Sequence, residues 1–153
     1  MPGSEGDTEF DTEDATEGPG VPVVLFLCTH NAGRSQMALG WLHHLAAGRA
    51  IALSGGSNPA PETNPMAVAA MREVGIDISG LSPKRWTEEF VRASDVVVTM
   101  GCGDACPVLP GKQYLDWDVP DPAGLPLADV RPIRDEIGRR VRQLLDRLQV
   151  SVG

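Results

Sequence analysis

The chain has 153 residues, a length that suits one domain with a sizeable core. Its net charge of −8 is uneven: seven of its 21 acidic residues lie in residues 1–20, which lack Lys and Arg, and the remainder carries 14 acidic against 13 basic side chains. A domain this close to neutral argues against a nucleic-acid partner, and no apolar run is long enough to span a membrane.

Residues 1–20 are predicted to be a disordered acidic tail, followed by a single domain over residues 21–150. The tail is rich in Gly, Glu, Asp and Thr, with Phe10 as its only aromatic residue, and this composition favours a solubilising extension over a binding segment. Because acidic residues precede the first apolar run, the N-terminus does not resemble a signal peptide. An odd count of three cysteines then indicates a reducing cytoplasm with reactive thiols.

A short apolar run, Val23–Leu27, begins the domain and is typical of a strand buried on both faces. It ends at Cys28, Arg34 follows six residues later, and residues 35–47 show the apolar spacing of a helix. The order is therefore strand, Cys-x5-Arg loop, helix.

This order predicts an anion-binding loop. A loop that enters a helix N-terminus leaves backbone N–H groups unpaired, and the helix dipole adds partial positive charge there. Arg34 can add a planar pair of donors, and the same field favours a thiolate at Cys28. A thiolate beneath a bound tetrahedral oxyanion could attack phosphorus or arsenic. The alternative is a buried cysteine that ends a strand, with a surface arginine by chance; the flanking strand and helix favour the functional interpretation.

Strands are also predicted over residues 50–54, 95–100 and 113–119, with a turn at Gly55 and Gly56. Helices are predicted from Asn64 to about residue 74 and over residues 86–93 and 129–148. This alternation indicates an α/β fold with a parallel sheet covered on both faces. Ligands of such sheets bind beyond the carboxyl ends of the strands, so we expect Cys28, Gly101 and Asp121 to meet in one crevice.

Two further groups of residues could carry chemistry. Asp121 begins an Asp-Pro pair and could act as a general acid, although Asp-Pro is also a common turn. Cys102 and Cys106 are four residues apart, about 6 Å between Cα atoms on a helical turn and therefore within disulfide range. Two unrelated loop cysteines or part of a metal site are the alternatives. A structural zinc site would need a second pair of ligands, so redox chemistry is favoured and no metal is expected.

Residues 28–38, CTHNAGRSQMA, resemble the loop of the low-molecular-weight tyrosine phosphatase superfamily, and most closely its arsenate reductase branch. The resemblance implies a three-layer sandwich with a four-stranded parallel sheet in flavodoxin-like strand order. It also implies that Asn31 shapes the loop in a left-handed conformation and that Ser54 steadies this asparagine. Ser35 could form a hydrogen bond with the Cys28 thiolate. Ordinary turn and cap chemistry is the alternative; it is as good an explanation for Ser54 and a weaker one for Asn31 and Ser35. The oxyanion would lie against Thr29, His30, Asn31, Ala32, Gly33, Arg34 and Ser35.

The same resemblance implies the reduction of arsenate to arsenite for arsenic detoxification, without a cofactor. Cys28 would attack arsenate with Asp121 as the acid, Cys102 would then attack Cys28 and release arsenite, and Cys106 would take over the disulfide. Phosphate and sulfate would compete with arsenate. The reductant would be thioredoxin, or mycothiol with mycoredoxin, because the Cys-x3-Cys spacing is similar to that of actinobacterial members. Leu39 replaces a glutamate that helps to hold potassium in the thioredoxin-coupled type, so we expect no potassium site, and we expect a monomer.

Two other functions compete with this one. A low-molecular-weight protein phosphatase needs Cys28, Arg34 and Asp121 but neither of the other cysteines. Such phosphatases place tyrosines after the Asp-Pro pair, whereas Ala123 and Gly124 follow it here, which favours a small oxyanion. A non-catalytic protein that binds arsenite or a soft metal through its three thiols would explain neither the arginine nor the aspartate.

Overall fold

The computed structural model describes residues 21–101 and 110–150, so the acidic tail predicted for residues 1–20 and both Cys102 and Cys106 lie outside the described residues. Four parallel strands form a sheet in the order β2-β1-β3-β4. The strands are β1 (Val23–Cys28), β2 (Ile51–Gly56), β3 (Val96–Met100) and β4 (Gln113–Asp116).

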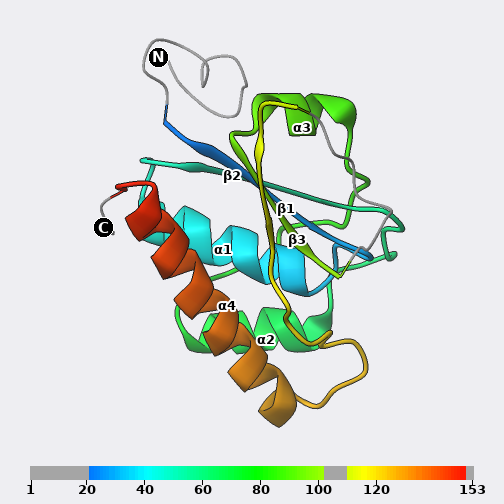
Figure 1. Cartoon of the computed structure of the whole chain (residues 1–153). Helices are drawn as coiled ribbons and strands as arrows, with labels where there is room; N and C mark the ends of the chain where they lie inside the picture. The colour runs from blue at the N-terminus through cyan, green and yellow to red at the C-terminus, as the bar shows by residue number, and fades with distance from the viewer. Residues whose placement is uncertain (1–20, 102–109, 151–153) are drawn as a thin grey trace.

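Helices cover both faces of this sheet (Figure 1). The helices α1 (Arg34–Ala46), α2 (Pro65–Glu73) and α4 (Leu127–Arg147) lie on one face, and α3 (Glu88–Ala93) lies on the other. The strand order and the two helical layers confirm the predicted three-layer α/β sandwich with a flavodoxin-like sheet.

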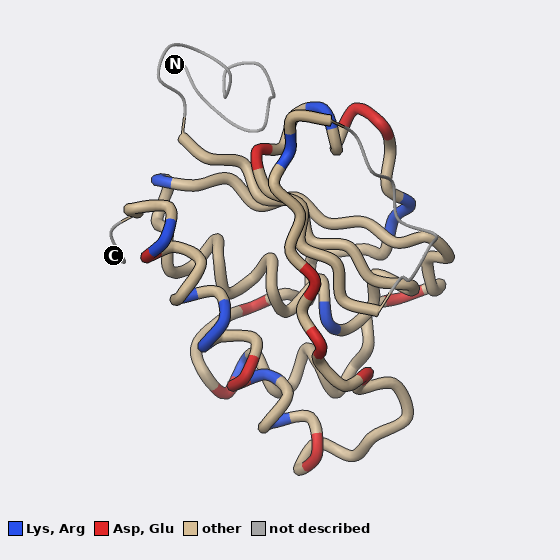
Figure 2. The backbone as a smooth tube through the Cα atoms, in the orientation of Figure 1, with Lys and Arg blue, Asp and Glu red and all other residues tan. Residues whose placement is uncertain are grey.

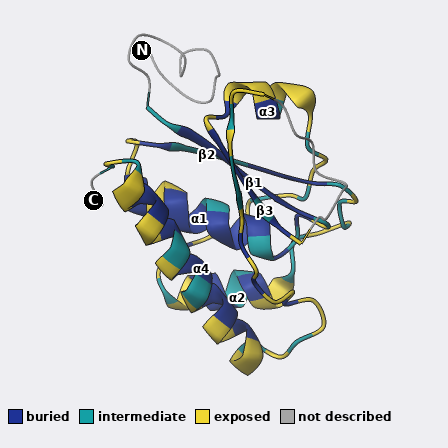
Figure 3. Cartoon of the chain, in the orientation of Figure 1, coloured by how far each residue is buried: buried dark blue, intermediate teal, exposed yellow. Residues whose placement is uncertain are grey.

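Strand β1 lies in the middle of the sheet, and all six of its residues are buried. Val24 and Phe26 pack into the large core beneath α1, α2 and α4, whereas Leu25 and Leu27 pack into a smaller core on the α3 side. An unbroken apolar run is therefore needed, because alternate side chains point to opposite faces of a strand. Figure 3 shows the buried strands between the helical layers, with α3 mostly exposed. The arrangement places Cys28 at the centre of the carboxyl edge of the sheet.

Several element boundaries differ from the prediction, most clearly at Gly55 and Gly56. These glycines are part of β2 rather than a turn, and a Cβ atom on Gly55 would lie 2.8 Å from the Cα of Trp86, while one on Gly56 would lie 2.6 Å from the carbonyl oxygen of Thr29. The strand continues because glycine leaves room for both neighbours. β4 is shorter than predicted, and α3 begins later because Thr87 caps it by accepting a hydrogen bond from the Phe90 amide.

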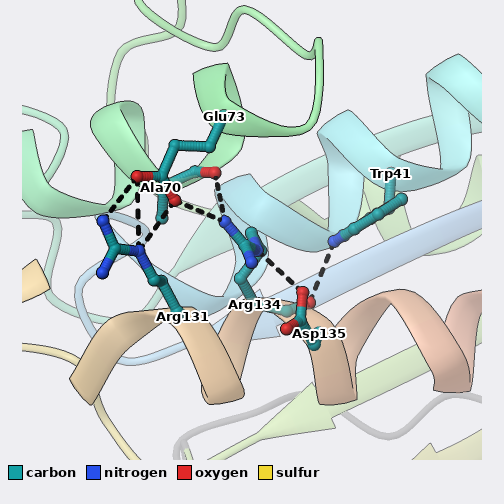
Figure 4. Close-up of polar contacts among 6 residues, drawn as sticks. All are labelled: Trp41, Ala70, Glu73, Arg131, Arg134 and Asp135. Carbon is teal, nitrogen blue, oxygen red and sulfur yellow. Dashed lines mark hydrogen bonds and ion pairs between the residues drawn. The ribbon is translucent and has the colours of Figure 1, made fainter. Parts of the chain in front are cut away.

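A cluster of charged side chains ties α2 to α4 (Figure 4). Glu73 accepts hydrogen bonds from Arg131 and from Arg134, with shortest N···O distances of 2.7 and 2.8 Å. Arg134 is 8% exposed, and it also donates to the Ala70 carbonyl and to Asp135. This ion-pair cluster (Glu73, Arg131, Arg134 and Asp135) holds α2, whose N-terminus borders the site described below. The Trp41 indole of α1 donates to the main-chain carbonyl of Arg134, which links α4 to α1 at the same residue.

The longest helix, α4, carries acidic and basic residues along its length (Figure 2). Its apolar residues, among them Ile137, Val141 and Leu145, are buried against the core. In the part of the chain that the structure describes, no helix combines the length and the apolar character needed to cross a membrane.

Candidate oxyanion site

The oxyanion loop, residues 28–35, joins the end of β1 to the start of α1. Four of its carbonyl groups accept hydrogen bonds from the main chain of residues 57–64, the segment that follows β2. The carbonyls of Cys28, Thr29, His30 and Ala32 accept from the amides of Ser57, Asn58, Ala60 and Asn64, with N···O distances of 3.4, 2.8, 3.0 and 2.8 Å. In a trans peptide the N–H points away from the carbonyl of the preceding residue. The N–H groups of residues 29, 30, 31 and 33 are therefore turned away from residues 57–64, as an anion site requires.

The Cys28 thiol lies at the floor of the loop and receives hydrogen bonds from it. The residue is 3% exposed, its sulfur accepts from the Asn31 amide at 3.2 Å, and the Ser35 hydroxyl oxygen lies 2.9 Å away. Ser35 also accepts a hydrogen bond from the Asn31 side-chain amide at 2.6 Å, and either the hydroxyl or the thiol can be the donor between Ser35 and Cys28. The expected contact between Ser35 and Cys28 is therefore present.

Asn31 has the expected left-handed backbone, with a φ of 51°, and it is fully buried. Its side-chain carbonyl accepts from the Lys84 amide at 2.9 Å and from the Gln36 side-chain amide at 3.2 Å. Ser54 donates to the other end of the Gln36 side chain at 3.2 Å, so its support of Asn31 runs through Gln36. Partial burial also lowers the pKa of Lys84 from its ordinary value. Sequence reasoning missed Gln36, because only the tertiary structure brings residues 31, 36, 54 and 84 together.

Arg34 reaches from the start of α1 toward the ends of β3 and β4. Its guanidinium donates to the Val119 carbonyl at 3.1 Å and lies 3.7 Å from a carboxylate oxygen of Asp121. A Cβ atom on Gly101 would lie 2.5 Å from Nη1 of Arg34, and Gly101 has a φ of +89°. The Thr29 hydroxyl donates to the Gly101 carbonyl at 3.0 Å. The loops after β1, β3 and β4 therefore meet around Arg34, as expected from their positions at strand ends. Gly101, however, lines a neighbouring hollow rather than the cavity that Cys28 and Asp121 line.

Asp121 lies beside Arg34 and is only loosely held. Its side chain is 47% exposed, and one carboxylate oxygen accepts from the Ala123 amide at 3.0 Å. The following Pro122 packs on Gly33 so closely that a Cβ atom on that glycine would lie 2.7 Å from the proline ring. This contact keeps the aspartate beside the oxyanion loop.

These groups enclose a cavity of about 30 Å³. It is lined by Cys28, His30, Ala32, Gly33, Arg34, Asn64, Asp121 and Ala123. A thiol, a guanidinium and a carboxyl group around such a small space suit a bare tetrahedral oxyanion. His43 and His44 are exposed at the other end of α1, away from the cavity.

Comparisons with known proteins agree with this geometry. The family model of the low molecular weight phosphotyrosine protein phosphatases matches residues 23–152. The chain is 39% identical to arsenate reductase 2 of Staphylococcus saprophyticus over 127 residues, which cover 80% of this chain and 95% of that protein. It is 40% identical to the arsenate reductase of Halalkalibacterium halodurans over 130 residues, 78% of this chain and 92% of that protein.

A solved structure of a thioredoxin-dependent arsenate reductase from Corynebacterium glutamicum superposes with a TM-score of 0.78 and 43% sequence identity. The superposition covers 89% of this chain and 66% of that one. Sequence, fold and loop geometry thus lead to one conclusion: the chain belongs to the low-molecular-weight phosphotyrosine protein phosphatase family.

Proposed function

We propose that this protein reduces arsenate to arsenite and serves in arsenic detoxification. The observation that carries the proposal is the Cys28 thiol, which is hydrogen-bonded to the Asn31 amide and the Ser35 hydroxyl and lines a small cavity together with Arg34 and Asp121. Relatives named arsenate reductase, at 39% and 40% identity, support arsenic rather than phosphorus as the atom attacked.

In the first step, the Cys28 thiolate forms a bond to arsenic while one As–O bond breaks. The departing hydroxyl takes a proton from Asp121 and leaves as water, while Arg34 and the loop N–H groups hold the remaining oxygens. Asp121 suits this role because its side chain is half exposed and because the adjacent Pro122 packs on Gly33 of the oxyanion loop.

In the second step, the Cys102 thiolate attacks the sulfur of Cys28. A disulfide forms, and the electron pair of the S–As bond moves to arsenic, which is reduced from As(V) to As(III) and leaves as arsenite. Cys106 then attacks Cys102, frees Cys28 and leaves a Cys102–Cys106 disulfide. A dithiol protein of the thioredoxin type reduces this disulfide; mycothiol with mycoredoxin is the alternative, and the thioredoxin-dependent relative supports the former. These thiols require a reducing compartment, so we place the enzyme in the cytoplasm. We also propose that it is a monomer.

A second candidate function is phosphatase activity, which the family model favours. Phosphate and sulfate would fit the same loop, but a phosphocysteine has no reductive exit and can only hydrolyse. Because Ala123 gives the cavity no aromatic wall, we expect aryl phosphates to be poorly oriented and slowly hydrolysed.

One coupled assay separates these functions: the full chain is mixed with thioredoxin, thioredoxin reductase and NADPH, and NADPH oxidation is followed. We expect oxidation that depends on arsenate and that phosphate inhibits without replacing it. Efficient hydrolysis of phosphotyrosine peptides without arsenate reduction would make the chain a phosphatase. Stoichiometric arsenite binding without turnover would make it a thiol-based binding protein.

A further inference from the structure

Asn64 lines the oxyanion cavity, although its sequence position suggests only a helix cap. We propose that the side-chain amide of Asn64 donates a hydrogen bond to the bound oxyanion and is a substrate-binding residue. The inference rests on the proposed function for the identity of the oxyanion, but it concerns only anion binding in this cavity.

Asn64 is held by three hydrogen bonds around its backbone and side chain. Its main-chain amide donates to the Ala32 carbonyl of the oxyanion loop at 2.8 Å, and its carbonyl accepts from the Val68 amide at 3.0 Å. Its side-chain oxygen accepts from the Met66 amide at 2.8 Å, the N-cap bond of α2. The side chain is thus fixed relative to the loop before any ligand binds, which lowers the entropy lost on binding.

The N-cap bond also decides which end of the amide is free. Only the side-chain oxygen can accept from the Met66 N–H, so the amide is oriented with its NH₂ group directed away from the helix end. Within the described residues, no hydrogen bond occupies that NH₂ group, and Asn64 shares the cavity wall with Cys28 and Arg34. A donor beside an anion-binding cavity, without a protein acceptor, is suited to an oxygen of the ligand.

The choice of asparagine at this position fits both roles. Aspartate caps helices as well as asparagine does, and the helix dipole favours its negative charge. A carboxylate at the wall of this cavity would, however, repel an arsenate or phosphate dianion. The neutral amide keeps the cap and supplies a donor, whereas aspartate would keep the cap and oppose the ligand.

Both ends of α2 are held by other parts of the fold. The ion-pair cluster joins the last turn of α2 to α4 (Figure 4), and the main-chain amide of Asn64 donates to the Ala32 carbonyl of the loop at the other end of α2.

The test compares three variants of the full chain, with inorganic phosphate as the probe in isothermal titration calorimetry at constant ionic strength. Asn64→Asp keeps the cap and replaces the donor by a charged acceptor, and Asn64→Ser keeps a cap but has too short a side chain. The matched control is Thr87→Asp, which adds the same charge at the N-cap of α3 on the other face of the sheet.

We expect Asn64→Asp to weaken phosphate binding on the order of tenfold or more, Asn64→Ser by several-fold, and Thr87→Asp by less than about twofold. Melting temperatures should change little, because all three variants retain a capping acceptor. Arsenate KM should rise in step with the phosphate Kd while kcat changes less.

Unchanged phosphate affinity in Asn64→Asp, or an equal loss in Thr87→Asp, would overturn the inference, as would a wild type that binds no phosphate. If Asn64→Asp were less stable, the Asn64→Ser variant would decide the matter. A protein that reduces no arsenate but loses phosphate affinity in Asn64→Asp would refute the proposed function and retain the inference. Normal arsenate reduction with an unchanged KM in Asn64→Asp would refute the inference and retain the proposed function.

Discussion

Two arginine–carboxylate pairs lie at the two ends of α2, and they are built differently. In the ion-pair cluster, Glu73 accepts from Arg131 and Arg134 at 2.7 and 2.8 Å, and these bonds, that of Arg131 above all, lower the pKa of Glu73 to about 2. At the oxyanion site, Arg34 lies 3.7 Å from Asp121, and its other contact is the Val119 carbonyl.

The difference matches what each pair must do. A carboxylate that joins two helices is best kept ionised, and two close guanidinium groups achieve that. A general acid must pick up and give away a proton, and an arginine that binds an anion must remain available to it. Distance and partner number thus distinguish the pair in the ion-pair cluster from the pair that we propose to be catalytic, although both pair an arginine with a carboxylate.

The largest difference in catalytic efficiency should appear when Arg34 and Arg134 are each replaced by methionine in separate variants. Arg34→Met should lower kcat/KM for arsenate on the order of 10³-fold, because the oxyanion loses its charged donors, with little change in stability. Arg134→Met should lower the free energy of unfolding by roughly 2 kcal/mol, because Ala70 and Glu73 lose their partner, and leave turnover intact. Steady-state kinetics and urea unfolding of both variants would measure this; equal effects of the two variants on kcat/KM would contradict the distinction.

The two carboxylates should differ in the same way. Asp121→Asn should slow formation of the arsenic adduct on the order of 100-fold, the usual scale for a lost general acid, while phosphate still binds. Glu73→Gln should leave that rate unchanged. Single-turnover kinetics would compare the two, and an unchanged rate in Asp121→Asn would mean that another group supplies the proton.

The position of the Arg34 guanidinium can be tested by a substitution at Gly101, which lies against it. Gly101→Ala places a methyl group against the guanidinium and should raise the phosphate Kd by about tenfold, since the arginine must shift. Gly75→Ala is the matched control, because Gly75 has a similar φ of +82° and no atom within 4 Å of the added Cβ. Calorimetric titration of both variants separates displacement of Arg34 from backbone strain; comparable losses would attribute the effect to strain.

The ion-pair cluster also predicts how stability depends on pH. The pKa of Glu73 is about 2 in the folded state, below its ordinary value of 4.5. The folded state therefore binds the proton less tightly than the unfolded chain does. The stabilisation from Glu73 is therefore complete above about pH 4.5 and is lost as the pH falls toward 2. Melting temperatures of wild type and Glu73→Gln should converge over this range, and a constant difference would show that Glu73 is not the group responsible.

The smallest effect is expected from the acidic tail, which belongs to neither pair. Its composition leaves it almost nothing to bury, so deletion of residues 1–20 should change neither turnover nor the melting temperature. Thermal unfolding and the coupled assay on the shortened chain test this, and a fall of many degrees would assign the tail a structural role.

Local sequence patterns determined much of this protein. The apolar run before Cys28 and the spacing to Arg34 identified the strand, loop and helix, because each depends on residues that are neighbours in the chain. Asparagine at position 31 indicated the left-handed turn for the same reason. The alternation of strands and helices was sufficient for the parallel sheet and for the edge at which Asp121 and Gly101 lie.

Contacts between distant segments were decided only by the tertiary structure. The strand over residues 51–56 continues through two glycines because Trp86 and Thr29 pack against them, which no local turn preference could indicate. Gln36 links Ser54 to Asn31, and Asn64 combines a helix cap with a place in the cavity wall. Local propensity predicts what a residue does for its own element, whereas its hydrogen-bond partners across the fold depend on how the elements pack.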